Sequence, residues 1–205
     1  MMTAIFVVLS VLCIGGVELL KRSAGLSPEF SRRLAHVGAA LIAAVSPYFL
    51  GAPIIIVACI IFALLVLIGR RTALLSSIHG VQRTSYGDVC LPLGEALAAA
   101  LFLPHSIVAF QFGVLVMGLA DPAAGIVGER FGRVSLPVPW VSKTLEGSCM
   151  FFLVACCIAA VFAPSLGVAL FALSAVLTLI EGVLGYGLDN LVLPAVGGLL
   201  LLALV

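Results

Sequence analysis

Long apolar runs alternate with short polar connections along most of the chain. The runs are rich in Leu, Ile, Val and Ala and lack the period-two alternation of an outer-membrane barrel, which favours helices. At roughly 20 residues per crossing, the pattern predicts an all-α, polytopic membrane bundle of about eight transmembrane helices, within a range of roughly seven to nine. The predicted spans are 2–20, 34–50, 53–69, 89–103, 106–127, 147–163, 165–181 and 190–205. The runs at 89–103 and 190–205 are short for a hydrocarbon core of about 30 Å, so either could be a partial span.

Composition supports a membrane protein. The 205 residues are 63% hydrophobic and 9% charged, with a mean hydropathy of +1.35, which leaves too little polar surface to coat a soluble globule. The formal net charge of +1 offers no basic field for a nucleic acid. All six cysteines lie in or beside apolar runs without a C-x-x-C pair, so we interpret them as packing residues and not as disulfides or zinc ligands. A single transmembrane domain over 1–205 is expected.

The cationic side chains predict the orientation of the bundle. All ten Lys and Arg residues lie in three connections, at 21–33, 70–88 and 128–146. An even number of spans places these connections on one side, which the positive-inside rule makes cytoplasmic, with both termini outside. We therefore predict a multi-pass protein of the cytoplasmic (inner) membrane. Four aromatic residues lie at span ends as interfacial anchors would: Tyr48, Tyr86, Trp140 and Tyr186.

Acidic side chains collect on the same side. Five lie at or within a turn of it: Asp88, Glu129, Glu146, Glu181 and Asp189. Asp121 lies nine residues before Arg130, hence about 13 Å deeper if the segment is helical. Ionisable groups near hydrocarbon are costly and usually mark function, so we expect one cytoplasmic polar site.

The segment around Asp121 is the most informative. Asp121 followed by Pro122 predicts a helix restart, with Asp121 as the N-cap. Asp121, Gly125, Gly128 and Gly132 then follow at spacings of four, three and four, which places them on one helix face. This face could let a ligand or metal approach the backbone beside a carboxylate, or it could pack small residues between helices.

The sequence S-K-T-L-E-G at 142–147 directly precedes the sixth span. That helix begins on the cytoplasmic side, where its unpaired N–H groups, with Lys143 and the hydroxyls of Ser142 and Thr144, would make a phosphate seat. Glu146 beside them would suit a divalent cation. The alternative is an ordinary cytoplasmic lysine followed by a helix cap. No Walker A motif occurs.

The last connection carries Glu181, glycines that permit a tight turn, and then Asp189 and Asn190. Capping of the final helix explains one of the last two polar residues but not Glu181 as well. Carboxylate oxygens are ligands that Mg²⁺ prefers, together with nucleotide phosphates.

Three further features are weaker alone. The sequence R-R-L-A-H at 32–36 places two cations and His36 at the entry of the second span, and S-Y-G-D at 85–88 precedes the fourth. Glu95 and Gln111 lie nearer mid-membrane, where they could pair with each other or bind a buried hydroxyl group.

Together these segments resemble the CTP-dependent lipid-alcohol kinases, which include dolichol, phytol and farnesol kinases and the yeast-type diacylglycerol kinase. They follow the family's order from about residue 30 to 194: R-R-L-A-H at 32–36, Y-G-D at 86–88, A-D-P-A-A-G-I-V-G at 120–128 (family G-D-x-x-A-x-x-x-G), K-T-L-E-G at 143–147 (family K-T-x-E-G), and Glu181 with D-N-L-V-L-P at 189–194 (family E…D-N-x-x-x-P). The chain departs from the pattern at Ala120 and Pro122.

The resemblance implies transfer of the γ-phosphoryl group of CTP to the hydroxyl of a lipid alcohol that enters sideways between helices. Mg²⁺ would be held by Asp121, Glu146 and Asp189, with Asp121 also counted as catalytic, and Asp88 or His36 would accept the alcohol proton. The residues expected to bind the nucleotide are Lys143, Thr144, Glu146, Gly147, Arg130, Gly125, Gly128 and Asn190. Glu95 and Glu181 are expected to contact the substrate.

Two alternatives remain at this point. A CTP:phosphatidate cytidylyltransferase would also use CTP at a membrane. Its signature includes His-Gly-Gly, and none of the three histidines of this chain is followed by Gly-Gly. A small-solute transporter would require inverted repeats and midplane charge, for which only Glu95 and Gln111 are candidates.

Overall fold

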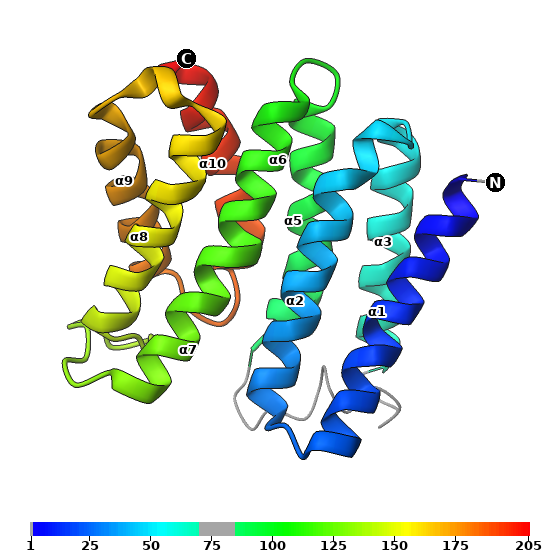
Figure 1. Cartoon of the computed structure of the whole chain (residues 1–205), viewed down its shortest axis with the longest axis horizontal. Coiled ribbons are helices and arrows are strands. Elements are labelled where there is room, and N and C mark those ends of the chain that lie inside the picture. Colours follow the sequence, from blue (N-terminus) through cyan, green and yellow to red (C-terminus); the bar gives the residue numbers. More distant parts are fainter. Residues whose placement is uncertain (1, 70–84) are drawn as a thin grey trace.

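The computed structural model describes residues 2–69 and 85–205, which form a bundle of helices (Figure 1). The helices are α1 (Met2–Ala24), α2 (Pro28–Val45), α3 (Ala52–Gly69), α5 (Gly87–Phe102), α6 (Ile107–Leu115), α7 (Asp121–Phe131), α8 (Leu145–Phe162), α9 (Ala169–Val183) and α10 (Asp189–Leu204). A π-helical segment, η2 (Val116–Ala120), joins α6 to α7, and the 3-10 turns η1 (Ser46–Tyr48) and η3 (Pro164–Leu166) follow α2 and α8. The prediction of an all-α protein is confirmed: the described residues contain no strand, only an isolated bridge between Ser135 and Thr144.

With α6, η2 and α7 taken as one helix, the described residues form eight long helices that match the eight predicted runs within a few residues. The largest difference is in α2, which begins six residues before the predicted span. Ser27 explains this start because its hydroxyl accepts a hydrogen bond from the N–H of Phe30 (3.2 Å), with Pro28 in the first helical position. Arg32, Arg33 and His36 therefore lie on the helix itself.

Three of the described helices are long and apolar enough to cross a membrane: α3, the continuous helix Ile107–Phe131, and α8. Helices α9 and α10 are apolar but shorter. Several large apolar side chains of α3 point outward and are about half exposed, among them Val57, Ile61 and Leu64. Such a surface suits contact with lipid, because lipid tails leave no reason to bury these groups. Eight spans remains a prediction.

The centre of the bundle is formed where α5, α6 and α10 cross closely. Gly94 of α5 lies against the backbone of Asn190, and Gly113 of α6 lies against the backbone of Pro194. A side chain at either glycine would collide with α10, so these residues set the spacing between the helices. Large buried side chains fill the adjoining core, including Phe112, Phe151, Met117, Leu177 and Leu193.

The polar connections share one end of the bundle. Figure 1 shows the connections 25–27, 132–144 and 184–188 at the end opposite the C-terminus. The two basic connections at 21–33 and 128–146 therefore lie together, as the sequence predicts. Most of the third predicted connection, with Arg70, Arg71 and Arg83, lies outside the described residues. Which side of a membrane this end faces stays a prediction.

Candidate active site

Lys143 joins three segments at the polar end of the bundle. Its Nζ lies 2.7 Å from Oε1 of Glu181 and 2.8 Å from Oδ2 of Asp189, and it donates a further hydrogen bond (2.6 Å) to the backbone carbonyl of Glu181. Burial opposes the charge on this ammonium group, but the carboxylates of Asp189, Glu181 and Asp121 outweigh that effect and raise the pKa of Lys143 above its usual value. The lysine is therefore a fixed cation that joins the loop before α8 to the end of α9 and the start of α10.

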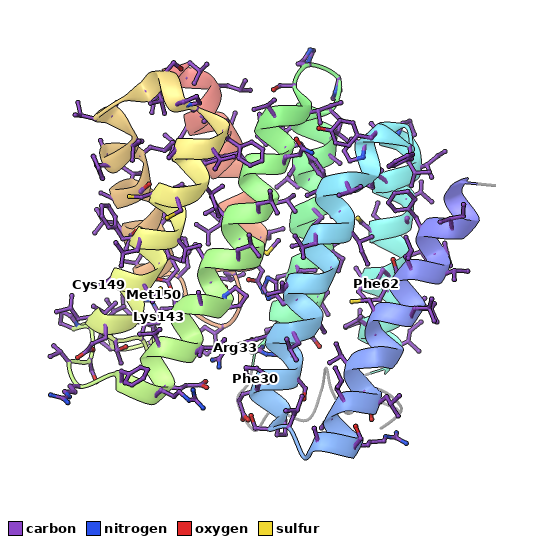
Figure 2. All side chains as sticks on the ribbon, in the orientation of Figure 1. Phe30, Arg33, Phe62, Lys143, Cys149 and Met150 are labelled. Atoms are coloured by element: carbon purple, nitrogen blue, oxygen red, sulfur yellow. The ribbon has the colours of Figure 1, made fainter. Side chains whose placement is uncertain are left out.

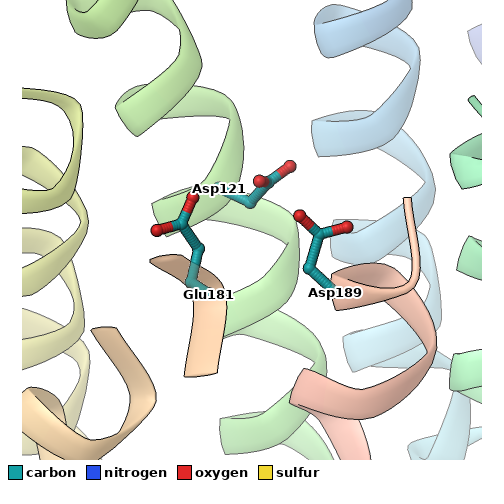
Figure 3. Close-up of side chains that lie close together, drawn as sticks. All are labelled: Asp121, Glu181 and Asp189. Atoms are coloured by element: carbon teal, nitrogen blue, oxygen red, sulfur yellow. The ribbon is translucent and has the colours of Figure 1, made fainter. Parts of the chain in front are cut away.

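Asp121, Glu181 and Asp189 form a group that we call the acidic cluster (Figure 3). One carboxylate oxygen from each residue lies within 4.8 Å of the other two. Glu181 and Asp189 are buried and Asp121 is half-buried. Lys143 pairs with two of these three carboxylates, so an ionised cluster holds excess negative charge that a cation would stabilise.

The oxygen atoms of the acidic cluster fit a magnesium ion. Oε2 of Glu181 is buried and has no hydrogen-bond partner in the part of the chain that the structure describes, an arrangement that costs free energy unless another group binds there. Oδ1 of Asp189 accepts a hydrogen bond from the N–H of Asn190 (3.0 Å), which orients the carboxylate. Mg²⁺ is a hard cation that prefers such carboxylate oxygens together with phosphate.

The prediction that Asp121 caps a restarted helix is wrong. The backbone of Asp121 is helical (φ −64°, ψ −48°), and the chain runs through η2 into α7 without a break. Pro122 lacks an N–H group, and the π-helical turn just before it accommodates the missing hydrogen bond. The side chain of Asp121 does not cap the helix and instead points toward Glu181 and Asp189 (Figure 3).

The structure places Glu146 outside the acidic cluster. Its two oxygens accept hydrogen bonds from the N–H groups of Arg133 (3.0 Å) and Val134 (3.4 Å) in the exposed loop after α7. Thr144 caps α8, since its hydroxyl accepts from the N–H of Gly147 (3.2 Å). Of the three residues predicted to hold magnesium, the structure brings Asp121 and Asp189 together but not Glu146. The third carboxylate beside the two aspartates is that of Glu181.

The glycine face of α7 packs against neighbours. Gly128 faces Gly147 at the start of α8, where an added methyl group would contact it, and Gly125 lies against the guanidinium of Arg33. Arg33 in turn pairs with Glu129 (Nη1 to Oε2, 2.6 Å), which ties α2 to α7. The glycines of this face therefore allow close packing against α2 and α8, whereas Asp121 belongs to the acidic cluster. Arg130 is exposed at the end of α7, and Figure 2 shows Arg33 and Lys143 near the same end of the bundle.

A cavity of about 720 Å³ adjoins this site between α1, α2, α3 and α5. Its walls are mostly apolar, and Phe62 of α3 is one of the side chains that line them (Figure 2). Its volume is that of a small-molecule pocket. Four polar lining residues lie in the first half of α2 or at the starts of α5 and α10: Arg32, His36, Asp88 and Asn190.

A turn holds this polar mouth in place. Gly187 adopts a positive φ (86°) and lies against Gly87, while the N–H of Tyr86 donates to the carbonyl of Tyr186 (2.8 Å). The glycine turn expected in the last connection is therefore present. It brings Asn190 next to α5, where its Nδ2 donates to the carbonyl of Gly87 (2.9 Å). The Oδ1 of Asn190 is buried and has no hydrogen-bond partner within residues 2–69 and 85–205.

His36 and Asp88 both line the cavity mouth. Nε2 of His36 lies 2.8 Å from the sulfur of Met117 in η2. Asp88 orients its carboxylate through a hydrogen bond from the N–H of Val89 (3.0 Å) to its Oδ1. Both residues thus lie at the polar mouth of the cavity.

Glu95 and Gln111 do not pair with each other. Glu95 lines the cavity two turns along α5 from Asp88. Gln111 donates to the carbonyl of Ala44 (2.8 Å) and lies beside Tyr48, at the far end of α2. Sequence spacing alone could not separate these outcomes, because pairing of the two residues depends on the relative rotation of α5 and α6.

The sequence did not predict the positions of two residues of the site, Glu181 and Arg32. Glu181 was expected to contact substrate, whereas the structure places it in the acidic cluster. The one hint in the sequence was that capping of the final helix gives Glu181 no role. Arg32 was given no individual role, yet it lines the cavity and donates to the hydroxyl of Ser85 (3.3 Å). No sequence pattern distinguishes it from Arg33.

The fold and site together define a membrane protein with a buried acidic cluster beside an apolar cavity. Over 190 residues the chain is 28% identical to a protein described as a phytol kinase from Synechocystis sp., an alignment that covers 86% of this chain and 80% of that protein. No protein-family model matches the chain, and no solved structure matches it. The similarity agrees with the motifs and supports assignment to the lipid-alcohol kinase family.

Proposed function

We propose that the protein is a membrane kinase that transfers the γ-phosphoryl group of CTP to the hydroxyl of a lipid alcohol at the cytoplasmic face of the inner membrane. One observation carries the proposal: Asp189 and Asn190 are consecutive residues, and the first belongs to the acidic cluster while the second lines the cavity. Phosphate chemistry and a lipid hydroxyl would therefore meet at the start of α10. The similarity to a phytol kinase supports the same class of substrate.

Asp121, Glu181 and Asp189 would hold Mg²⁺ through their carboxylate oxygens. The bound ion would supply charge neutralisation for the transferring phosphoryl group. Lys143 is fixed beside these oxygens and would place a second positive charge near the phosphates, as electrostatic stabilisation of phosphoryl transfer requires. The exposed Arg130 and the first turn of α8, from Thr144 to Gly147, would bind the outer part of the triphosphate.

The lipid alcohol would lie with its chain in the cavity and its hydroxyl at the polar mouth. Asn190 lines this mouth, and its side chain would help to position the alcohol beside Asp88. The alcohol oxygen then forms a bond to the γ-phosphorus as the bond from that phosphorus to the bridging oxygen breaks, and CDP leaves with the electron pair. Asp88 would accept the alcohol proton, and His36 is the second candidate at the same mouth.

The direct test is to supply the purified protein in detergent micelles with Mg²⁺, a panel of lipid alcohols and γ-labelled CTP or ATP. We expect label in the lipid product and CDP in solution. No labelled lipid with either nucleotide would overturn the proposal, and release of pyrophosphate in place of CDP would identify a cytidylyltransferase.

A matched pair of variants links that activity to the site. Asp189→Asn removes a carboxylate from the acidic cluster, whereas Glu29→Gln makes the same chemical change in the first turn of α2, outside the cluster. We expect loss of transfer in the first variant and retention in the second.

A further inference from the structure

A second polar position lies deeper in the cavity, away from the mouth. Asp88, Leu91, Pro92 and Glu95 all line the cavity and occupy positions i, i+3, i+4 and i+7 of α5, so they form one stripe of that helix. Glu95 is the last of the four and lies about 10 Å along the helix axis from Asp88. Helical side chains lean toward the N-terminus, which brings the carboxyl of Glu95 closer to the mouth.

The carboxyl of Glu95 is only partly satisfied by the protein. The side chain is 5% exposed, and its Oε2 lies 3.8 Å from the sulfur of Cys59 on α3, a weak thiol donor. Oε1 is buried and has no hydrogen-bond partner among the described residues. A buried carboxyl oxygen without a partner costs free energy, so its position on a cavity wall indicates a ligand group that binds there.

We propose that Glu95 determines substrate specificity by forming a hydrogen bond to a second polar group of the lipid alcohol, located between the reacting hydroxyl and the hydrocarbon chain. This inference rests on the proposed kinase function and narrows its substrate class. A carboxyl accepts from a hydroxyl and, when protonated, donates to a carbonyl oxygen. The ester groups of a diacylglycerol lie within a few bonds of its hydroxyl and fit this position. A plain isoprenoid alcohol would leave Oε1 without a partner.

The specificity of such a contact comes from the cost of leaving Glu95 unsatisfied. A site built to bind a polar group rejects an analogue that lacks it more strongly than an apolar wall rejects a change of size. Most of the lining is apolar, including Leu91 and Pro92 on the same stripe of α5, so it offers little to replace a polar group of the ligand. Chain length would be read by the wall, and the second polar group by Glu95.

The test compares three lipids as substrates: a diacylglycerol, its dialkyl ether analogue, which keeps the hydroxyl but lacks the ester carbonyls, and phytol. We expect the wild-type protein to prefer the diacylglycerol, and Glu95→Leu to reduce that preference on the order of tenfold. Glu95→Gln keeps a donor and an acceptor and should retain the preference. Cys59→Ala, which removes the thiol but leaves Glu95 in place, should also retain it.

Several outcomes would overturn the inference. Equal turnover of the three lipids by the wild-type protein would do so, as would an unchanged preference in Glu95→Leu or an equal loss on all three lipids. If Glu95→Leu does not fold, Glu95→Gln and thermal stabilisation of the wild-type protein by each lipid without nucleotide carry the test, and equal stabilisation by all three lipids would overturn it. Absence of phosphorylation of every lipid by the wild-type protein is a different result, since it rejects the proposed function itself.

Discussion

The ammonium group of Lys143 lies 2.8 Å from Oδ2 of Asp189, although the two residues are 46 positions apart in the sequence. The contact joins the loop before α8 to the first residue of α10, and Glu181 at the end of α9 shares the same lysine. The residue that we expect to act on the phosphates is therefore also the residue that holds three helix ends together.

Replacement of Lys143 should affect both stability and turnover. Lys143→Met leaves two buried carboxylates without their cation, and we expect a loss of about 3–5 kcal/mol in stability together with loss of phosphoryl transfer. Thermal unfolding in detergent and initial rates measure the two effects. Lys21→Met, at the end of α1, is the control. A Lys143→Met protein with wild-type stability would show that the contacts of this lysine do not support the fold.

The acidic cluster predicts a different metal dependence from that expected from the sequence. Removal of Mg²⁺ by a chelator should abolish activity, and Glu181→Gln should raise the Mg²⁺ concentration for half-maximal activity by roughly 10- to 100-fold. Glu146→Gln should change that concentration much less, because the carboxylate of Glu146 binds backbone N–H groups of an exposed loop. Initial rates measured over a range of Mg²⁺ concentrations distinguish the two residues. A larger effect of Glu146→Gln than of Glu181→Gln would identify Glu146 as the magnesium ligand.

Asp88 and His36 can be separated as proton acceptors. We expect Asp88→Asn to lower kcat by roughly 100- to 10,000-fold with little change in the KM for CTP. His36→Gln should lower kcat less, since a ring nitrogen of His36 already contacts the sulfur of Met117. Rates measured across pH provide the second readout, because loss of the general base removes the corresponding limb of the profile. A larger effect in His36→Gln would assign the base to the histidine.

The cavity predicts a separation between lipid and nucleotide binding. Ala58 of α3 lines the cavity, so Ala58→Phe would occupy part of its volume. We expect a higher KM for long lipid alcohols, a smaller effect on short ones and no change in the KM for CTP. Ala160→Phe introduces the same side chain on an exposed position of α8 and should leave all three values unchanged. Equal effects of the two substitutions would exclude the cavity as the lipid site.

Local sequence signals predicted the helices, although the predicted span missed the start of α2 by six residues. Ser27 with Pro28 marks the start of α2, and Thr144 marks the start of α8, because short polar side chains satisfy N–H groups within the same turn. The expected cap at Asp121 failed because the π-helical turn before it accommodates Pro122 without a break. That outcome depends on the packing of neighbouring helices and not on the local sequence.

The candidate site was anticipated in its residue types and in the end of the bundle where it lies. Asp121, Lys143, Glu146 and Asp189 were expected to converge, and the structure brings together all of them except Glu146. The assignment of roles to Glu146 and Glu181 could not be made from spacing. Each lies near a helix end on the polar side, and only the direction of the side chain separates a loop-binding carboxylate from a member of the acidic cluster.

By itself, the sequence determined that this chain is a bundle of apolar helices with its charges gathered at one end, because hydrophobic burial and the cost of charge in hydrocarbon act on each segment separately. Only the tertiary structure decided which charges meet. The close crossings at Gly94 and Gly113 fix the position of α10, and that position sets Asp189 in the acidic cluster and Asn190 in the cavity wall. Such convergence depends on the rotation and spacing of helices that are far apart in the chain, which no local pattern records.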